Sequence, residues 1–288
     1  MPRRQPGLQL RAGLRVLRRA PDQVQIGLDP HHAMVLPLTE PVRRTLDVLS
    51  SPGAPSRAGV RADVRADADV LARLAEHDAL APAVDTGAET DPPSVHVRRF
   101  GTTPWPGLDR LLRQAGLRAV DPAQSPVAAG LLIGVGEPER SLLDPWIRAG
   151  LPHLVVRVSE GVAVVGPFSA PGDGACLRCV DAHHADTDPR WPLLVEQQIG
   201  SAHRDDGVPD PAPPALLALA AGWALTDLLA FLDGGRPATW SATLRLPPSL
   251  TGAELVSWLR HRACGCGWNK SQPRGGSPPH HAWVRMEG

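Results

Sequence analysis

The sequence predicts an α/β protein in which a small N-terminal winged-helix module precedes a larger sheet domain. Three observations predict this division. Three short apolar runs and two amphipathic helical patterns open the chain, strand and helix patterns then alternate, and the four cysteines form two close pairs late in the sequence. The expected boundaries are 1–82 for the module, 83–93 for a linker, 94–268 for the sheet domain and 269–288 for a flexible tail.

The N-terminal module is predicted from turn residues and helical spacing. Apolar runs at 14–19, 23–28 and 33–38 are separated by "APD" and "DPHH", which predicts a three-stranded meander. A helix is expected from Glu40 and a second one from about Asp67 to Leu80, where apolar residues recur every three or four positions. Three strands followed by helices are typical of a winged-helix module.

The sheet domain begins after a segment of small, acidic and proline residues, "APAVDTGAETDPP", which marks the linker. Strand and helix patterns then alternate, and this alternation predicts a parallel sheet with crossover helices. A long apolar helix is expected near 213–232 and another strand near 238–246. The helix comes closest to a membrane span, but Asp227 interrupts it and alanine dominates it, so a buried helix is the better interpretation.

Composition excludes several classes of partner. Lys plus Arg and Asp plus Glu balance at 30 each, so the basic excess of a nucleic-acid binder is missing. The N-terminus lacks an apolar run of signal-peptide length, which leads us to expect a cytoplasmic protein without a membrane partner. Lysine occurs once, at Lys270, so ATP chemistry that needs a lysine would depend on the tail.

The four cysteines form C-x-x-C and C-x-C motifs, at Cys176, Cys179, Cys264 and Cys266. Each pair can chelate an ion, and a tetrahedral thiolate site needs four such donors, so structural zinc is expected. Disulfides are an alternative that a cytoplasmic location disfavours, and reduced packed cysteines are one that the pairing disfavours. A catalytic zinc would require one of the four not to be a ligand.

Acidic and histidine side chains follow the first cysteine pair: Asp181, His183, His184, Asp186 and Asp188. Acid–base chemistry is one interpretation of this cluster. The favoured one is a polar loop in which Asp186 or Asp188 caps the following turn. His183, His184 and His261 are likewise interpreted as surface or capping residues, with a place in or around the metal site as the alternative.

A nucleotide site is not supported by the glycine patterns. In "FGTTPWPG", after the first strand of the sheet domain, two prolines remove amide donors and Trp105 fills space where a phosphate would bind. In "IGVGEPER", a lone G-x-G is followed by Glu137 and Glu139, whose charge opposes a phosphate. We therefore expect no ATP, although arginines such as Arg98 leave that inference open.

The segments around the two cysteine pairs resemble those of a known family. Two segments carry the resemblance, "GPFSAPGDGACLRCVDAHHADTDPRWPLLVEQQ" and the closing "HRACGCGW". Together with the predicted sheet domain and the module before it, they resemble leader-peptide-binding proteins of actinobacterial thiazole/oxazole-modified microcin biosynthesis. These are ThiF-like partner proteins of YcaO cyclodehydratases in azoline RiPP pathways, and the resemblance covers most of the chain. It implies a PqqD-like leader-recognition module and a ThiF-like, Rossmann-type domain that has lost adenylation. It also implies a structural zinc on the four cysteines, and a homodimer.

The leader site follows from the resemblance and from the open edge of a meander, to which an extended peptide can add as a strand. The resemblance places the leader between the third strand, 33–38, and the helix from Asp67 to Leu80. Arg65 and Arg73 would pair with acidic leader residues. The residues expected to contact the leader, with core packing the alternative for the apolar ones, are Met34, Val35, Leu36, Arg65, Leu71 and Leu74.

The sequence thus predicts a non-catalytic adaptor that binds a precursor leader peptide and presents the core peptide to a separate YcaO-type cyclodehydratase. The alternative is a ThiF-like enzyme that adenylates a peptide carboxylate with ATP. A winged-helix DNA-binding regulator is a third hypothesis, which the acidic residues of the module do not favour.

Overall fold

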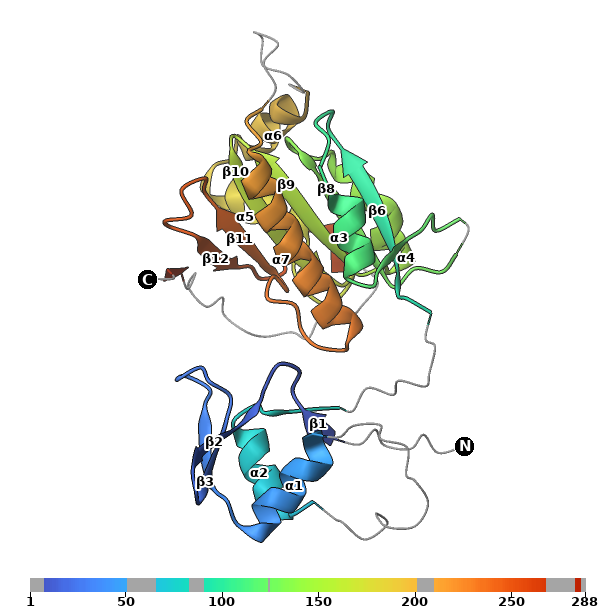
Figure 1. The fold of residues 1–288 in the computed structure, drawn as a ribbon. Coiled ribbons are helices and arrows are strands. Elements are labelled where there is room, and N and C mark those ends of the chain that lie inside the picture. Colours follow the sequence, from blue (N-terminus) through green and yellow to red (C-terminus); the bar gives the residue numbers. More distant parts are fainter. Residues whose placement is uncertain are drawn as a thin grey trace. The chain divides into compact units, whose positions relative to one another are not determined.

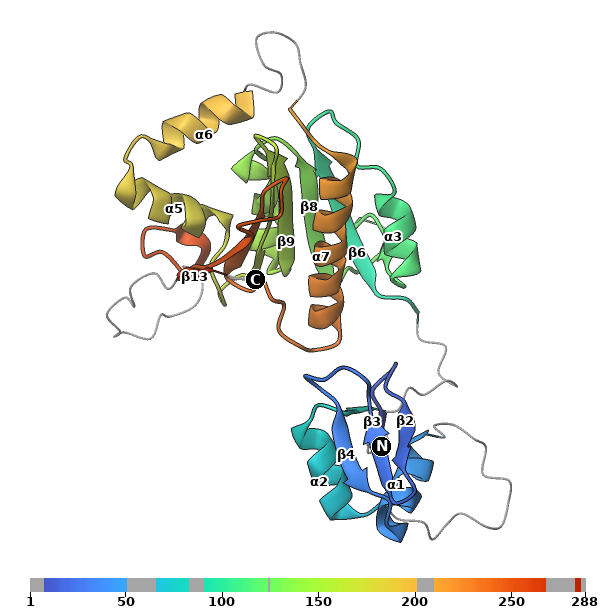
Figure 2. The ribbon, with the colours of Figure 1, turned by 60° about the vertical axis from the view of Figure 1, so that its left-hand side comes forward.

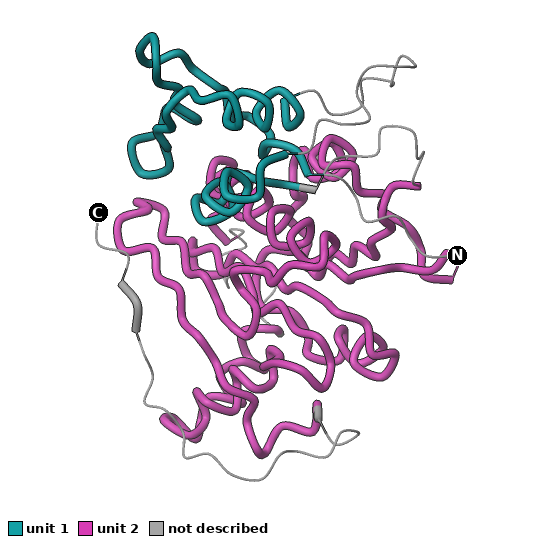
Figure 3. The backbone as a smooth tube through the Cα atoms, turned by 90° about the horizontal axis from the view of Figure 1, so that it is seen from below, with its two compact units in different colours: residues 1–90 teal, residues 91–288 magenta. Residues whose placement is uncertain are grey.

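The chain folds into two compact units, residues 1–90 and 91–288 (Figure 3). In the computed structural model, the described part of the chain comprises residues 8–50, 66–82, 91–123, 125–200, 210–267 and 283–285. Most of the predicted linker, at 83–90, and Arg65 lie outside it.

The N-terminal unit contains a three-stranded antiparallel sheet, ordered β2-β3-β4 (Figures 1 and 2). Its strands are β2 (Val16–Ala20), β3 (Gln23–Ile26) and β4 (Met34–Pro37). The predicted meander is therefore confirmed. Two further strands, β1 (Leu8–Leu10) and β5 (Leu80–Pro82), pair antiparallel with each other and were not predicted.

Two helices, α1 (Glu40–Ser50) and α2 (Ala68–Glu76), complete this unit. The carboxylate of Asp67 caps α2 by accepting hydrogen bonds from the amides of Asp69 and Val70, at 3.1 and 3.2 Å. The buried hydroxyl of Thr45 on α1 accepts the Asp67 amide at 2.9 Å and so ties the two helices together. The predicted start of α2 is confirmed, but the helix ends before Leu80 because the chain turns into β5.

The core of the N-terminal unit combines alternate residues of β3 and β4 with one face of each helix. Strand side chains alternate between the two faces of a sheet, so every second residue can be buried. The buried apolar residues are Val24, Ile26, Met34, Leu36, Val42, Leu46, Leu49, Val70, Leu74 and Ala79.

The C-terminal unit is built on an eight-stranded sheet, ordered β13-β12-β11-β10-β9-β8-β6-β7. The strands β7, β6, β8 and β9 are parallel, and the remaining neighbours are antiparallel. The parallel sheet expected from the sequence is therefore a mixed one, because β9 and β10 are joined by a turn of only two residues, Glu160 and Gly161, both with positive φ. The strands are β6 (Ser94–Phe100), β7 (Arg118–Ala119), β8 (Ala129–Val135), β9 (His153–Ser159), β10 (Val162–Ser169), β11 (Ala242–Leu246), β12 (Glu254–Ser257) and β13 (Trp283–Arg285).

Helices cover both faces of this sheet, which explains why every residue of β8 is buried. One face carries α3 and α7 (Figure 1), and α4 and the start of α5 pack on the other, around Leu132, Trp146 and Leu177. The helical segments are α3 (Leu108–Gln114), η1 (Arg140–Leu143), α4 (Asp144–Ala149), α5 (Leu177–Thr187), α6 (Trp191–Gly200), α7 (Pro214–Leu232) and η2 (Gly265–Gly267).

Four of the five acidic and histidine residues after the first cysteine pair lie on α5, so the polar loop expected there is wrong. The helix forms because Leu177 and Val180 bury its first turns against the core. The capping role expected nearby is confirmed for Asp188, whose carboxylate accepts the Arg190 amide at 3.0 Å.

Within the described residues, α7 is the one helix long and apolar enough to cross a membrane. Its buried face packs against the sheet and includes Leu217, Ala221 and Leu228. A core helix of a folded domain meets the same length and composition criteria, and the predicted helix with a buried face is confirmed.

Asp227 is the buried acid of α7, and we predict a structural role for it. Its carboxylate accepts the amides of Ala238 and Thr239, at 2.9 and 3.0 Å, and the Thr239 hydroxyl. Asp227→Ala leaves these donors without an acceptor and should lower the free energy of unfolding by about 3 kcal/mol, measured by urea denaturation. The neighbouring exposed Thr226→Ala should change it by less than about 0.5 kcal/mol, and equal effects would contradict this role.

His153 gives the C-terminal unit a predicted pH dependence. The ring is 1% exposed, its Nδ1–H donates to the Leu151 carbonyl at 2.9 Å, and burial lowers its pKa below the ordinary value. Because the folded-state pKa lies below the unfolded one, the neutral ring favours folding above about pH 6.5, and this contribution is lost as the pH falls from there towards the folded-state pKa. Urea midpoints should therefore fall less between pH 7.5 and 5.5 in His153→Gln than in the wild type; parallel curves would refute this.

Candidate functional site

The four cysteines converge in the C-terminal unit. Their sulfur atoms all lie within 4.8 Å of one another. Cys176 Sγ is 3.8 Å from that of Cys179 and 3.6 Å from that of Cys264, and the Cys179 and Cys266 sulfurs are 3.6 Å apart. Sulfur atoms about 3.8 Å apart are what a tetrahedral zinc with bonds of about 2.3 Å requires. The donor set therefore fits a metal ion, and the sulfur separations are not those of disulfides.

Local structure explains how the first pair is positioned. Cys176 is the N-cap of α5, and its carbonyl accepts the amides of Cys179 and Val180. Both sulfurs therefore lie near the positive end of the helix dipole, which favours thiolates. The second pair follows β12, with Cys264 just before η2 and Cys266 within it, and Trp258 packs against the cluster. A bound ion would thus join the start of α5 to the C-terminal end of the sheet.

The thiols influence each other strongly because they are close and partly buried. Hydrogen bonding with Cys179 raises the pKa of Cys176, while the same contact lowers the pKa of Cys179. Hydrogen bonding with Cys176 lowers the pKa of Cys266 to about 7. The four groups cannot all ionise without a compensating charge, and a divalent cation supplies it.

The residues expected to contact a peptide divide into two groups. Met34, Leu36 and Leu74 are at most 4% exposed and belong to the core of the N-terminal unit. Val35 is 40% exposed, and Leu71 lies half-buried at the border of that core. The side chains of Val35 and Leu71 are therefore partly accessible from outside the unit, and Arg65 lies outside the described residues.

The backbone of β4 presents one open edge. It pairs with β3, and within the described part of the chain no strand pairs with its other side. The Leu38 amide donates to the Asp22 carbonyl at 2.7 Å, and bonded and non-bonded pairs alternate along an antiparallel ladder. By this alternation the N–H and C=O of Val35, which is opposite Gln25, point away from β3. Pro37 has no N–H, so Val35 supplies the amide that an added strand would use.

The loop after β6 is occupied by its own side chains. Trp105 is 8% exposed, and its indole N–H donates to the Leu217 carbonyl of α7 at 3.1 Å. Pro104 and Pro106 on either side have no N–H to offer. The loop is therefore poorly suited to bind a phosphate, as expected from its sequence.

Gly134 of "IGVG" and Gly101 of this loop have a packing role. A Cβ on Gly134 would lie 2.2 Å from the Phe100 carbonyl oxygen, and one on Gly101 would lie 2.3 Å from that of Val135. Glycine at 101 and 134 is therefore required where β6 and β8 approach each other closely. This requirement explains Gly134 without a nucleotide, whereas Gly136 has open space beside it and a positive φ of 95°.

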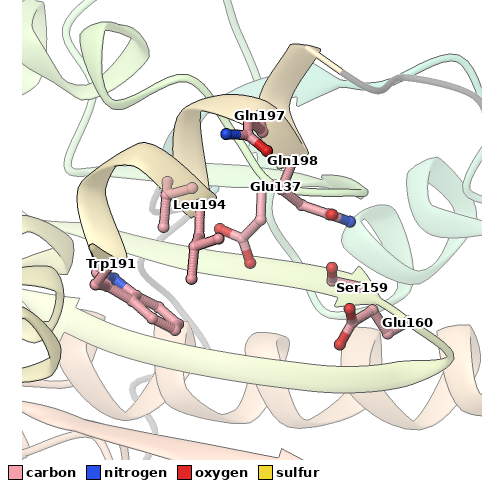
Figure 4. A pocket seen from close by; sticks show the side chains of 8 residues that line it. Glu137, Ser159, Glu160, Trp191, Leu194, Gln197 and Gln198 are labelled. Carbon is pink, nitrogen blue, oxygen red and sulfur yellow. The ribbon is translucent and has the colours of Figure 1, made fainter. Parts of the chain in front are cut away.

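A cavity of about 520 Å³ lies beyond the carboxyl ends of β8 and β9, beside α6 (Figure 4). Open α/β sheets bind their ligands at such ends. Apolar, amide and carboxylate side chains line it, and none of the described residues that do so is basic. A phosphate there would meet the carboxylates of Glu137 and Glu160. The lining residues are Glu137, Ser159, Glu160, Trp191, Leu194, Val195, Gln197 and Gln198.

Glu137 belongs to a partly buried ion network that joins α5 and α6 to the sheet. It accepts hydrogen bonds from Arg157 at 2.8 Å and from Arg140 at 2.9 Å. Arg140 also holds Asp181 through two bonds of 2.8 Å, and the Trp191 indole donates to Asp181 at 3.1 Å. Burial alone would raise the pKa of Asp181, but Arg140, together with Trp191 and Arg157, lowers it below the ordinary value. Sequence reasoning missed this network because its partners are up to 41 positions apart.

No protein-family model matches the chain, and no curated protein matches it. Solved structures do. A heterocyclase in complex with substrate and cofactor has a TM-score of 0.65 at 18% identity, covering 92% of this chain and 40% of that one. The heterocyclase TruD has a TM-score of 0.63 at 16% identity, covering 91% and 43%. Escherichia coli MccB has a TM-score of 0.52 at 12% identity, covering 94% and 99%.

These likenesses establish a shared fold that includes both compact units. The chain spans less than half the length of the heterocyclases it matches, and nearly the whole length of MccB. The fold is therefore one found in RiPP-modifying proteins, while the role of this chain follows from its own site residues.

Proposed function

We propose that this protein is a non-catalytic adaptor of RiPP biosynthesis. The N-terminal unit acts as a PqqD-like winged-helix module that binds the leader of a ribosomally synthesised precursor peptide. The C-terminal unit acts as a ThiF-like domain with structural zinc on the four cysteines. A separate YcaO-type cyclodehydratase receives the core peptide and forms the azolines. We place the adaptor in the cytoplasm, and we predict that it forms a homodimer.

The observation that carries this proposal is the open edge of β4 at Val35. A leader strand added there would exchange backbone hydrogen bonds with Val35, and its alternate side chains would face the exposed Val35 side chain or the helix side of the sheet. Leu71 on α2 offers an apolar contact on that side. Arg73, in the last turn of α2, offers charge for an acidic leader residue.

The comparisons support the same proposal. One heterocyclase of this fold has been solved in complex with its substrate, and MccB has been solved in complex with MccA. The fold therefore occurs in proteins that bind a substrate or MccA. The match leaves more than half of each heterocyclase uncovered, and the proposal assigns the cyclodehydration chemistry to a separate protein. Holding the leader then raises the effective concentration of the core peptide at the partner's active site.

Calorimetry tests the proposal directly. The purified protein, of measured zinc content, is titrated with synthetic peptides translated from short reading frames that neighbour its gene, and separately with ATP and magnesium. We expect one peptide to bind with a dissociation constant of roughly micromolar or better and ATP not to bind. Failure of every such peptide to bind would overturn the adaptor.

An adenylating enzyme is the second candidate, because MccB has also been solved with ATP, at a TM-score of 0.51. A cavity at the carboxyl ends of parallel strands is where such a fold would hold a nucleotide. The carboxylates of that cavity and the Trp105 loop argue against it. Pyrophosphate exchange into ATP in the presence of a bound peptide would establish this enzyme, and we expect none.

A further inference from the structure

A second group of metal-ligand side chains lies on α5 and on the segment that leads to the second cysteine pair. His183 and Asp186 are three positions apart, so they occupy one face of α5 on consecutive turns. His261 reaches the same place from 75 positions further along the chain. One ligand-type atom of each residue lies within 4.8 Å of those of the other two.

The contacts within this group have the form of a metal site. His261 Nε2 lies 2.9 Å from Asp186 Oδ2, and the rings of His183 and His261 meet edge to face with centroids 4.9 Å apart. His183 Nε2 is 2.9 Å from the Leu259 carbonyl oxygen, to which it donates. Metal-binding histidines commonly donate one ring N–H to a backbone carbonyl, because that bond leaves the lone pair on the other nitrogen and orients the ring.

The donor set and its exposure define the ion. Two imidazoles and one carboxylate suit Zn²⁺, Co²⁺ or Ni²⁺ better than a hard cation such as Mg²⁺. The side chain of Asp186 is 66% exposed, so water can complete the coordination. The arrangement is thus an open site with three protein ligands, unlike the partly buried cluster of four sulfurs.

We propose that His183, Asp186 and His261 form a second divalent-metal site, separate from the four cysteines. The ion takes the place of the proton between His261 Nε2 and Asp186, and that proton moves to Nδ1, so His261 remains a neutral imidazole whose Nε2 lone pair binds the ion. The 3.2 Å contact between the Ala263 amide and His261 Nδ1 is then lost, so the ion is held less tightly than by four thiolates. The cysteines join the N-terminal end of α5 to the segment that follows β12. The second site joins the C-terminal half of α5 to that same segment, through His261.

Cobalt titration of the zinc-loaded, full-length protein tests this site. We expect about one Co²⁺ per chain to bind with ligand-field absorption but without a thiolate charge-transfer band, while the zinc on the cysteines stays in place. Asp186→Asn and His183→Gln should each weaken Co²⁺ binding by roughly tenfold or more. Both variants should keep the zinc content and the melting temperature of the zinc-loaded parent.

Matched controls separate this site from other ligands. Asp188→Asn changes the acid at the C-terminal end of α5, which lies outside the three-residue group, and should bind Co²⁺ like the parent. His280→Gln combined with His281→Gln removes a histidine pair near the C-terminus and should also leave binding unchanged. The proposal would be overturned if the parent did not bind Co²⁺, or if Asp186→Asn and His183→Gln bound it as tightly as the parent does.

Discussion

Replacing Cys266 by serine is expected to abolish zinc binding and to lower the melting temperature of the C-terminal unit by about 10 °C or more. A structural zinc contributes roughly 10 kcal/mol or more in small zinc-binding peptides, and a domain of this size shifts by about 2–4 °C per kcal/mol. Loss of even a third of that contribution gives the expected shift. Differential scanning calorimetry with metal analysis of the same sample measures both quantities.

Cys266→His is the matched variant. Cys266 is half-buried within η2, where an imidazole can replace the thiolate as a zinc ligand. This variant should retain about one zinc per chain and most of the melting temperature. A zinc-free Cys266→Ser protein that melts like the wild type would show that the cluster does not stabilise the fold.

Val35→Pro is expected to weaken leader binding by roughly tenfold or more. The substitution removes the amide that points to the open edge of β4, and its ring occupies the side where an added strand would lie. One backbone hydrogen bond contributes about 1 kcal/mol, and the steric conflict adds to its loss. Fluorescence anisotropy with a labelled leader peptide measures the affinity.

The opposite edge of the same sheet supplies the control. Val16 on β2 is 37% exposed, much like Val35 at 40%. The Gly27 amide donates to the Arg15 carbonyl, so by the same alternation the Val16 amide also points away from the sheet. Val16→Pro should leave leader affinity unchanged. Equal losses in both variants would indicate damage to the fold, and no loss in Val35→Pro would remove β4 from the peptide site.

Local patterns were sufficient for most elements of this protein. Turn residues separate β2, β3 and β4, and the capping carboxylate of Asp67 marks the start of α2, so both could be predicted from neighbouring residues alone. The polar helix α5 could not, because only its first turns carry buried apolar residues. The pairing of β1 with β5 joins segments of three residues that are about 70 positions apart, and no local signal announces it.

The expected peptide contacts show a second limit. A strand alternates its side chains, so Met34 and Leu36 are buried and Val35 is exposed, whereas the prediction had included all three. Which edge of the sheet stays open also depends on strand order, and a list of apolar runs does not contain that order. Val35, and not the buried Met34, is therefore the position at which peptide binding is tested.

The sequence by itself identified four cysteines suited to hold a metal ion, the N-terminal meander and the unsuitability of the Trp105 loop for phosphate. Each of these depends on residue types at short spacing. Only the tertiary structure decided that Glu137 pairs with Arg157 and that His261 meets His183 and Asp186. The physical reason is that strand order and helix packing set the distances between residues far apart in the chain. Those distances arise from burial of the whole core, which no short segment encodes.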